Sequence, residues 1–261
     1  MSNLENKVII VTGASSGIGR AAAEIMARQG ARVLLVARDR KALDEVCDGI
    51  RGAGGKAEVC RGDVAVKEDT LAAVDKAEQA FGPVDGFFAN AGISGTMAPI
   101  PDYSDEAFDE ILNVNLKSFF WAMKRVLPSM IARRTGSIVA TGSLASERGF
   151  PVTAGYVATK HALLGLVRCA AAEVSRHNVR VNLVIPGMIE TRLIENIADQ
   201  FGGDLPTALA ALGKMAPMGR VGSSAEVGEV VAFLMSDSAS YVSGQAWGVD
   251  GGILGTLMTG Q

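Results

Sequence analysis

The fold is decided by an apolar run and the loop behind it: Lys7-Val8-Ile9-Ile10-Val11-Thr12, then Gly13-Ala14-Ser15-Ser16-Gly17-Ile18-Gly19. The β-branched run is typical of a parallel strand buried on both faces. Residues 20–30 continue as a helical pattern that ends at a glycine. This order predicts a phosphate cradle, because the loop backbone can approach a pyrophosphate and the helix N-terminus attracts anions. The spacing G-x-x-x-G-x-G differs from the common G-x-G-x-x-G, and a purely structural turn is the alternative.

Strand and helix patterns alternate along the rest of the chain, without a linker, repeat or low-complexity stretch. Further strands are expected at residues 31–37, 57–61, 84–89, 136–141, 179–185 and 246–250. Helices are expected at residues 40–51, 67–81, 105–131 and 224–235, and a further helix carries Tyr156 and Lys160 and runs to about Ser175. The pattern predicts one α/β domain over residues 1–261, a doubly wound Rossmann-type fold with a mostly seven-stranded parallel sheet and helices on both faces. Residues 188–218 are rich in Met, Leu and Ile and have the character of a lid over a substrate.

Composition limits the kinds of partner. The 261 residues are 48% hydrophobic and 20% charged, and a net charge of −3 gives no reason to expect nucleic acid or an anionic membrane. The three cysteines have no CxxC spacing and are expected to be reduced thiols in a cytoplasmic protein. No signal peptide or membrane span is expected. With two histidines and scattered cysteines we expect no metal site, and no base for a serine hydrolase.

Tyr156 and Lys160 lie four residues apart, on one face of an expected helix. Such a pair suits proton transfer to or from a carbonyl or alcohol oxygen, with the lysine expected to lower the tyrosine pKa. The alternative is a tyrosine packed under a lysine stem. Ser143 follows a strand and places a hydroxyl at the carboxyl edge of the sheet. Asn115 interrupts the 105–131 helical pattern, either as a structural hydrogen-bonder or as part of a proton path.

The end of the second strand predicts the cofactor. An acidic residue there binds the ribose 2′-hydroxyl of NAD, whereas arginine suits the 2′-phosphate of NADP. Here Ala37 is followed by Arg38, which favours NADP, and Asp39 keeps NAD possible. Asp63 ends the third strand and is expected to receive the adenine amino group, or else to cap the helix that starts near Lys67.

The ordered motifs resemble the short-chain dehydrogenase/reductase family over nearly the whole chain. The matching residues are Thr12 to Gly19, Asp63, Asn90-Ala91-Gly92, Asn115, Ser143, Tyr156-x-x-x-Lys160 and Pro186-Gly187. The resemblance implies hydride transfer between NAD(P)(H) and a ketone or secondary alcohol. Two positions depart from the family pattern: Ala89 stands where asparagine is frequent, and Gly142 where serine is frequent.

The resemblance also implies roles for individual residues. Tyr156 would be the general acid/base, Lys160 would lower its pKa and bind the nicotinamide ribose, Ser143 would bind the substrate oxygen, and Asn115 would hold a relay water. The implied cofactor site comprises Gly13, Ser15, Ser16, Gly17, Ile18, Gly19, Arg38, Asp63, Val64, Asn90, Ala91, Gly92, Val114, Tyr156, Lys160, Pro186, Gly187, Ile189 and Thr191. Ile189 and Thr191 would meet the nicotinamide end.

The substrate is predicted by the residues expected to line its pocket. These are mainly apolar, which favours a ketone or alcohol with a hydrophobic body: Ser94, Met97, Leu144, Phe150, Met188, Leu193 and Ile194. Arg148 could meet an acidic group, although a solvated loop residue is the simpler interpretation.

Two alternative functions remain at this point. A 3-oxoacyl-acyl-carrier-protein reductase would need a basic patch beside the cleft, for which Arg125, Arg133 and Arg134 are candidates; a solvated face is the simpler interpretation. A non-catalytic nucleotide-binding regulator would be expected to lose the catalytic tyrosine or lysine. The resemblance implies a homotetramer. One apolar helix face would serve as interface or equally as core: Ala162, Leu163, Leu166, Val167, Ala170 and Ala171.

Overall fold

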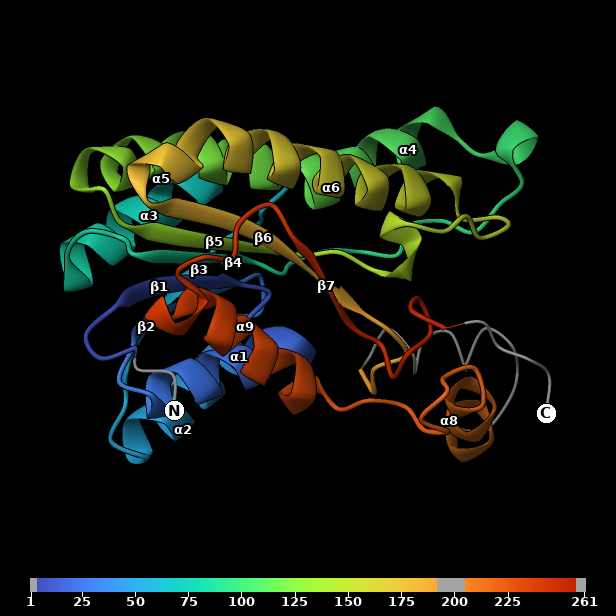
Figure 1. The fold of residues 1–261 in the computed structure, drawn as a ribbon, viewed down its shortest axis with the longest axis horizontal. Helices are drawn as coiled ribbons and strands as arrows, with labels where there is room; N and C mark the ends of the chain where they lie inside the picture. The colour runs from blue at the N-terminus through green and yellow to red at the C-terminus, as the bar shows by residue number, and fades with distance from the viewer. Residues whose placement is uncertain (1–3, 192–204, 257–261) are drawn as a thin grey trace.

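The computed structural model describes residues 4–191 and 205–256. In these residues one parallel sheet holds seven strands in the order β3-β2-β1-β4-β5-β6-β7 (Figure 1). The strands are β1 (Val8–Thr12), β2 (Arg32–Ala37), β3 (Lys56–Arg61), β4 (Gly86–Ala89), β5 (Gly136–Thr141), β6 (Val179–Pro186) and β7 (Ala246–Val249). The doubly wound α/β fold expected from the sequence is confirmed, with strand bounds within two residues of those expected.

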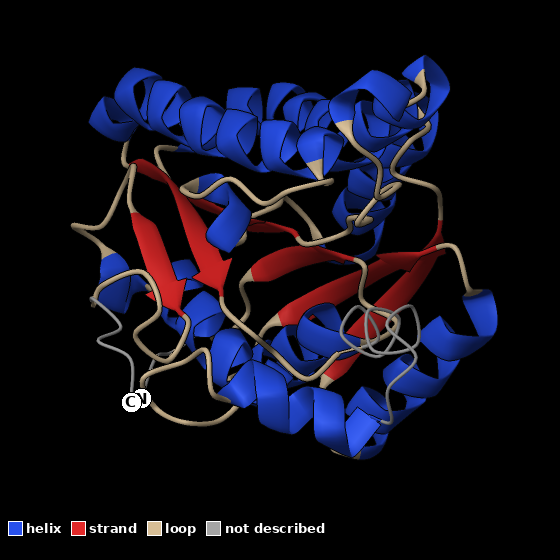
Figure 2. Ribbon diagram, turned by 90° about the vertical axis from the view of Figure 1, so that its right-hand side faces the viewer, coloured by secondary structure: helices blue, strands red, loops and turns tan. Residues whose placement is uncertain are grey.

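Helices form a layer on each face of the sheet, which Figure 2 shows from the right-hand side of Figure 1. One layer holds α1 (Gly17–Arg28), α2 (Arg40–Gly52) and α9 (Ser224–Met235). The other holds α3 (Lys67–Phe81), α5 (Ser118–Arg133) and α6 (Ala154–Val174), with α4 (Asp105–Leu112) beside α6. In the expected lid, α8 spans Leu205–Gly213, and residues 192–204 lie outside the described residues.

The helical pattern at 105–131 continues through a π-helical turn, η2 (Asn113–Lys117), which joins α4 to α5. We expected a break at this point. The chain stays helical through this turn, and the Ser118 hydroxyl donates to the Val114 carbonyl over 2.6 Å. A π-turn inside a helix is frequent at functional sites, and this one presents Asn115 to the sheet edge.

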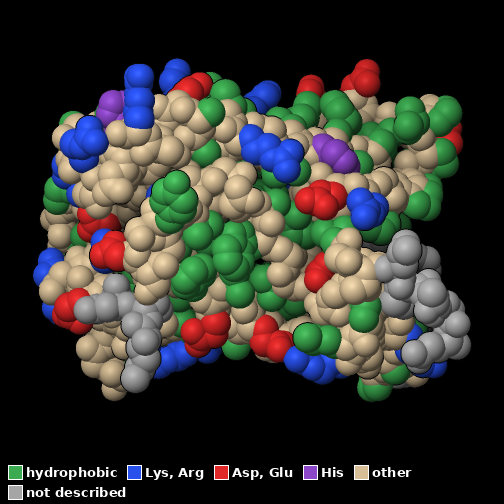
Figure 3. All heavy atoms as spheres, viewed as in Figure 1, with side chains coloured by type: hydrophobic (Ala, Val, Ile, Leu, Met, Phe, Trp, Pro, Cys, Tyr) green, Lys and Arg blue, Asp and Glu red, His purple; other side chains and the backbone are tan. Residues whose placement is uncertain are grey.

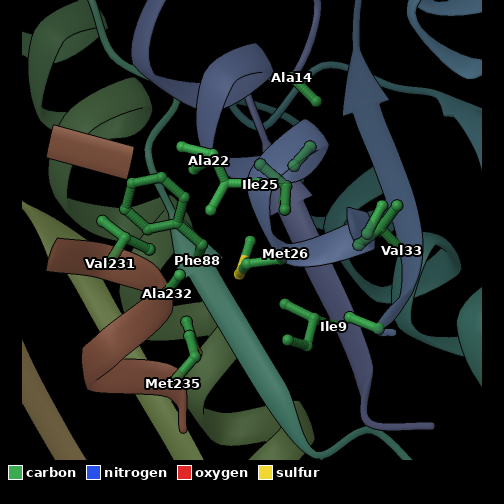
Figure 4. Close-up of a cluster of buried hydrophobic side chains, with 14 of the residues drawn as sticks. Ile9, Ala14, Ala22, Ile25, Met26, Val33, Phe88, Val231, Ala232 and Met235 are labelled. Carbon is green, nitrogen blue, oxygen red and sulfur yellow. The ribbon is translucent and has the colours of Figure 1, made fainter. Parts of the chain in front are cut away.

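Burial of the sheet on both faces explains its unbroken apolar strands. In β1, Ile9 and Val11 belong to the core under α1 and α9, while Val8 and Ile10 belong to the core under α3, α5 and α6. Figure 4 shows the first of these cores, where Phe88 from β4 lies among side chains of the two helices. Most strand side chains are apolar, and the buried polar ones within strands, such as Ser137, Arg180 and Asn182, are hydrogen-bonded to other segments.

α1 and α9 pack closely because Gly228 lies at their contact. A Cβ on Gly228 would lie 2.8 Å from Ile25 Cδ1 and 3.1 Å from the Ala22 backbone nitrogen. The matched position is Gly49 in α2, which is exposed and where an added Cβ would meet nothing within 4 Å.

Gly228→Ala is therefore expected to lower the free energy of unfolding. Overpacking costs about 1–3 kcal/mol, which exceeds the gain of up to about 1 kcal/mol from alanine in a helix. Gly49→Ala, the control, is expected to raise stability by that smaller gain. Urea unfolding of both variants checks this, and equal effects would contradict the packing argument.

Candidate functional site

The carboxyl ends of β1, β4 and β5 are tied together by Thr12 and Asn90. The Thr12 hydroxyl donates to the Phe88 carbonyl and accepts from the backbone N–H groups of Asn90 and Ala91, at 3.0 and 3.1 Å. The Asn90 amide donates to the Thr12 carbonyl, while its oxygen accepts from the Thr141 hydroxyl. Asn90 was expected in the cofactor site, and its side chain is engaged in holding the edge of the sheet.

Ser143, Tyr156 and Lys160 come together from the loop after β5 and the first turns of α6. Ser143 begins the short helix η3 (Leu144–Ser146), and its hydroxyl is hydrogen-bonded to Tyr156. The Lys160 ammonium lies 5.5 Å from the centre of the Tyr156 ring and donates to the Thr141 carbonyl over 2.7 Å. The three predicted groups thus form one cluster, with a hydroxyl, a phenol and a buried cation.

Burial sets the pKa values of this cluster. It lowers the Lys160 pKa to about 8, because the residue is only 5% exposed and its charged form loses hydration. It also raises the Tyr156 pKa, and the hydrogen bond with Ser143 opposes this only in part. Desolvation thus outweighs the other effects on Tyr156 here, and a lowering of its pKa by Lys160 stays a prediction.

Asn115 pins the loop after β4 to the π-turn. Its amide oxygen accepts from the Ile93 backbone and its nitrogen donates to the Ile93 carbonyl, both at 2.9 Å. The same nitrogen lies 3.3 Å from the Thr159 hydroxyl, which donates to the Tyr156 carbonyl. Asn115 is therefore a structural hydrogen-bonder. It also lines a cavity shared with Lys160, so the relay role remains a prediction.

The glycine loop leaves the start of α1 open to an anion. Ser16 is the N-cap, its side chain makes no capping hydrogen bond, and the first turn holds no acidic residue. The glycines allow the close turn: a Cβ on Gly19 would lie 2.2 Å from the Gly13 carbonyl oxygen. These N–H groups and the helix dipole fit the pyrophosphate of a dinucleotide, alongside Ser15, Gly17 and Ile18.

At the end of β2 the structure separates the roles of Arg38 and Asp39. The Asp39 carboxylate accepts from the Ala42 backbone and caps α2. The Arg38 side chain is 74% exposed, with one loose ion pair, 3.9 Å from the Asp63 carboxylate. The Asp63 carboxylate also accepts from the Ala65 backbone. The alternative role of Asp63 as a helix cap is wrong, since α3 has Val66 as its N-cap.

Beyond β6 the chain turns back beneath α9. The Gly187 backbone donates to the Val249 carbonyl, and Ile189 forms a β-bridge with Gly222. Thr191 lies beside Gly17, because a Cβ on Gly17 would be 3.4 Å from its methyl group. The expected nicotinamide end, from Pro186 to Thr191, therefore borders the glycine loop. Leu193 and Ile194, expected in the pocket wall, lie outside the described residues.

The loop after β4 and the loop before α6 contact each other at the start of α6. The Ala98 N–H donates to the Val152 carbonyl over 2.9 Å, and Ala98 forms a β-bridge with Thr153. Val152 has a φ of 59°, in the left-handed region. A β-branched residue is an outlier there, at a cost of about 1–3 kcal/mol.

The arginines expected for a basic patch are largely occupied. Arg125 pairs with Asp75 and Glu78, and Arg133 pairs with Asp85. Arg133 and Arg134 lie at the amino end of β5, the opposite edge of the sheet from Ser143. The apolar residues of α6 are mainly core, since Leu163, Val167, Ala170 and Ala171 are buried.

Three residues of the site had no assigned role in the sequence analysis. Thr12 and Thr159 act through hydroxyls that bind other segments, which no local pattern reveals. Ser146 accepts from the Ser143 backbone in a capping box and fixes the turn that carries the Ser143 hydroxyl. The Ser-x-x-Ser spacing would have indicated it. Ser146 also explains Gly142, where a Cβ would lie 2.8 Å from the Ser146 hydroxyl oxygen.

Other kinds of site are not found in the parts described. Among residues 4–191 and 205–256, His, Cys, Asp and Glu side chains form no group that could hold a metal ion. Within the same residues, every helix is too short or too polar to cross a membrane.

Comparisons with known proteins agree with this geometry. A family model described as enoyl-(acyl carrier protein) reductase matches residues 13–254. Cyclohexanol dehydrogenase of Acinetobacter sp. (strain SE19) is 39% identical over 96% of each chain. The chain belongs to the short-chain dehydrogenase/reductase family. It is an NAD(P)-dependent oxidoreductase that acts on CH–OH groups and the corresponding ketones.

Two further relatives bear on cofactor and substrate. A 3-oxoacyl-[acyl-carrier-protein] reductase of Thermotoga maritima is 37% identical and covers 96% of this chain and 99% of its own. The crystal structure of a single-residue variant of actinorhodin polyketide ketoreductase with NADPH has a TM-score of 0.90 and 32% identity, covering 98% of this chain and 100% of its own.

The buried lysine gives the fold a characteristic pH dependence. The Lys160 pKa is about 8 in the folded chain and 10.5 as its ordinary value. The unfolded chain thus binds more protons between these two pH values, so stability rises with pH across this window. Relative to Lys160→Met, the free energy of unfolding of the wild type is expected to rise by about 3 kcal/mol from pH 8 to pH 10.5.

Urea unfolding of both proteins at several pH values measures this difference, and other titrating groups cancel between them. If the free energy of unfolding of the two proteins changed with pH in the same way, burial would not lower the Lys160 pKa.

Proposed function

We propose that the protein reduces a ketone on an uncharged, apolar carbon skeleton, such as a six-membered ring, with NADPH as the preferred reductant. The observation that carries the proposal is the cluster of Ser143, Tyr156 and Lys160 beside a mouth of apolar side chains. The relative named for cyclohexanol supports the ring. A ketone and its alcohol differ by one hydride and one proton, and the cluster is suited to handle the proton.

Ser143 and Tyr156 would hold the substrate oxygen between them, and the polarised carbonyl carbon would then accept hydride. The raised pKa keeps Tyr156 protonated at neutral pH, which is the form that donates a proton to a carbonyl oxygen. The nicotinamide supplies the hydride when it is bound. Lys160 would hold its ribose and restore the tyrosine proton, because its own pKa lies near neutrality. Asn115 orders the loop and helix around Lys160.

The residues at the end of β2, where the adenine ribose of the cofactor is expected, favour NADP over NAD. Asp39, the carboxylate closest to the end of β2 in sequence, is engaged as the cap of α2. Arg38 is exposed and only loosely paired, so its guanidinium is available to a 2′-phosphate. The relative with NADPH agrees with this assignment.

An acyl-carrier-protein substrate is favoured by one relative and by the description of the family model. The three arginines considered for a basic patch do not support it. Arg125 and Arg133 already bind carboxylates, and Arg133 and Arg134 lie at the far edge of the sheet. An acidic carrier protein would need free cations beside the mouth.

We also propose that the protein is a cytoplasmic homotetramer. Phe120 on α5 is 46% exposed, and β7 is the edge strand of the described sheet. Figure 3 shows hydrophobic side chains at the surface near the middle of the view, where Figure 1 places β7. An apolar helix surface and an unpaired strand both favour association with another copy.

Tyr156→Phe tests the reaction. The variant keeps the ring and removes the transferable proton, so NADPH-dependent reduction of cyclohexanone is expected to fall at least about 100-fold. Cofactor affinity, followed by NADPH fluorescence, is expected to stay within a factor of about two because the ring packing is kept. A regulator without turnover would show no reduction in the wild type, and unchanged turnover in the variant would refute the role of Tyr156.

Arg38→Ala tests the cofactor. Loss of a charge-assisted hydrogen bond is expected to weaken NADPH binding about 10- to 100-fold and leave NADH binding unchanged. Arg40→Ala is the matched control, because Arg40 is occupied by Asp44 at 2.9 Å. Titrations at one salt concentration measure both. Equal weakening of both cofactors by Arg38→Ala would show that Arg38 does not contact the 2′-phosphate.

A further inference from the structure

Four exposed apolar residues lie on the two loops that meet at the start of α6, and we call them the entrance rim: Met97, Ile100, Phe150 and Val152. Their exposed fractions are 41%, 77%, 38% and 38%. Hydrophobic side chains reach the surface at the upper right of Figure 3, around α4. Neither residues 94–101 nor residues 149–155 contain a charged side chain. The rim is therefore suited to an uncharged, apolar ligand.

The rim is built on the start of the catalytic helix. The β-bridge between Ala98 and Thr153 joins its two loops, and the Thr153 hydroxyl donates to the Phe150 carbonyl. The Thr153 carbonyl in turn accepts from the Val157 backbone in the first turn of α6. Val152 lies four residues before Tyr156. Its segment is hydrogen-bonded to Ala98 on one side and to the first turn of α6 on the other.

Behind the rim, Tyr103 fills the space between the two loops. A Cβ on Gly155 would lie 2.6 Å from the Tyr103 hydroxyl oxygen, and one on Gly95 would lie 3.2 Å from it. The tyrosine is packed edge-on against Phe108. This packing keeps the 95–100 loop and the start of α6 at a fixed separation, so the rim is a defined surface.

Val152 is the unusual member of the rim. Among the described residues, the other non-glycine positions with positive φ are Asn6, Arg134 and Asn178. Asparagine tolerates this conformation, and Arg134 ends helix α5. Val152 is β-branched and partly exposed, so burial offsets little of its strain. Glycine would meet the backbone requirement without strain. A strained residue that gains little from the core indicates a role outside folding.

We propose that Val152 is a specificity-determining residue, which together with Met97, Ile100 and Phe150 receives the apolar skeleton of the ketone. The inference rests on the proposed function and extends it to the residues that select the substrate. The left-handed backbone lets the Val152 carbonyl bind Ala98 while its side chain contributes to the rim. On this proposal a small ketone would reach Ser143 and Tyr156 without filling the rim, whereas a ring would contact it.

Val152→Gly tests the proposal with two ketones, cyclohexanone and acetone, reduced by NADPH. The value of kcat/KM for cyclohexanone is expected to fall about tenfold, because a pocket that loses two or three methyl-sized groups loses about that much discrimination. The value for acetone is expected to stay unchanged. The urea midpoint is expected to stay the same or rise, because glycine relieves the strain.

Two further variants separate the causes. Val152→Asn keeps the size and tolerates positive φ, but it is polar, so it is expected to lose cyclohexanone discrimination as Val152→Gly does. Val66→Gly is the matched control: Val66 is 44% exposed, has an unstrained φ of −99°, and lies at the start of α3. It is expected to leave the ratio of the two kcat/KM values unchanged.

The outcomes separate this inference from the proposed function. An unchanged ratio in Val152→Gly overturns the role of Val152 while the function stands. Equal losses for both ketones also overturn it, because Val152 would then act by holding Tyr156 in place. A wild-type enzyme that reduces neither ketone with either cofactor overturns the proposed substrate class itself.

Discussion

The site depends on the hydrogen bonds that join the carboxyl ends of β1, β4 and β5. The strands bury mainly apolar side chains on both faces, and polar side chains at their carboxyl ends meet at one edge of the sheet. Asn90 spans this edge, from the Thr12 carbonyl to the Thr141 hydroxyl. The Thr141 carbonyl then receives the Lys160 ammonium. One network thus fixes both the glycine loop and the catalytic lysine.

Burial of that lysine connects stability with chemistry. Lys160 is 5% exposed, and the loss of hydration destabilises its charged form and brings its pKa towards neutrality. The same burial raises the Tyr156 pKa and keeps the phenol protonated. A solvated lysine would keep its ordinary pKa of 10.5. The fold therefore gives up some stability near neutral pH to hold a proton donor next to a cation that can exchange its own proton.

The two ends of the site have opposite character. At the adenine end, the open N-terminus of α1 and the exposed Arg38 present positive potential to phosphate groups. At the other end, the entrance rim is apolar and free of charge. Tyr156 and Ser143 lie between them, on elements that start or end at the sheet edge. This polarity matches a reaction between an anionic dinucleotide and an apolar ketone.

The sequence by itself determined the strands and helices, the glycine loop and the chemical identity of the cluster. These follow from periodicity and short motifs, which depend on residues close together in the chain. The tertiary structure decided what depends on distant neighbours. Asn115 binds the backbone of Ile93, Arg125 and Arg133 bind carboxylates about fifty residues away, and Val152 is held at positive φ by Ala98. The direction of the Tyr156 pKa belongs to this group, because desolvation depends on everything packed around a side chain and on no local pattern.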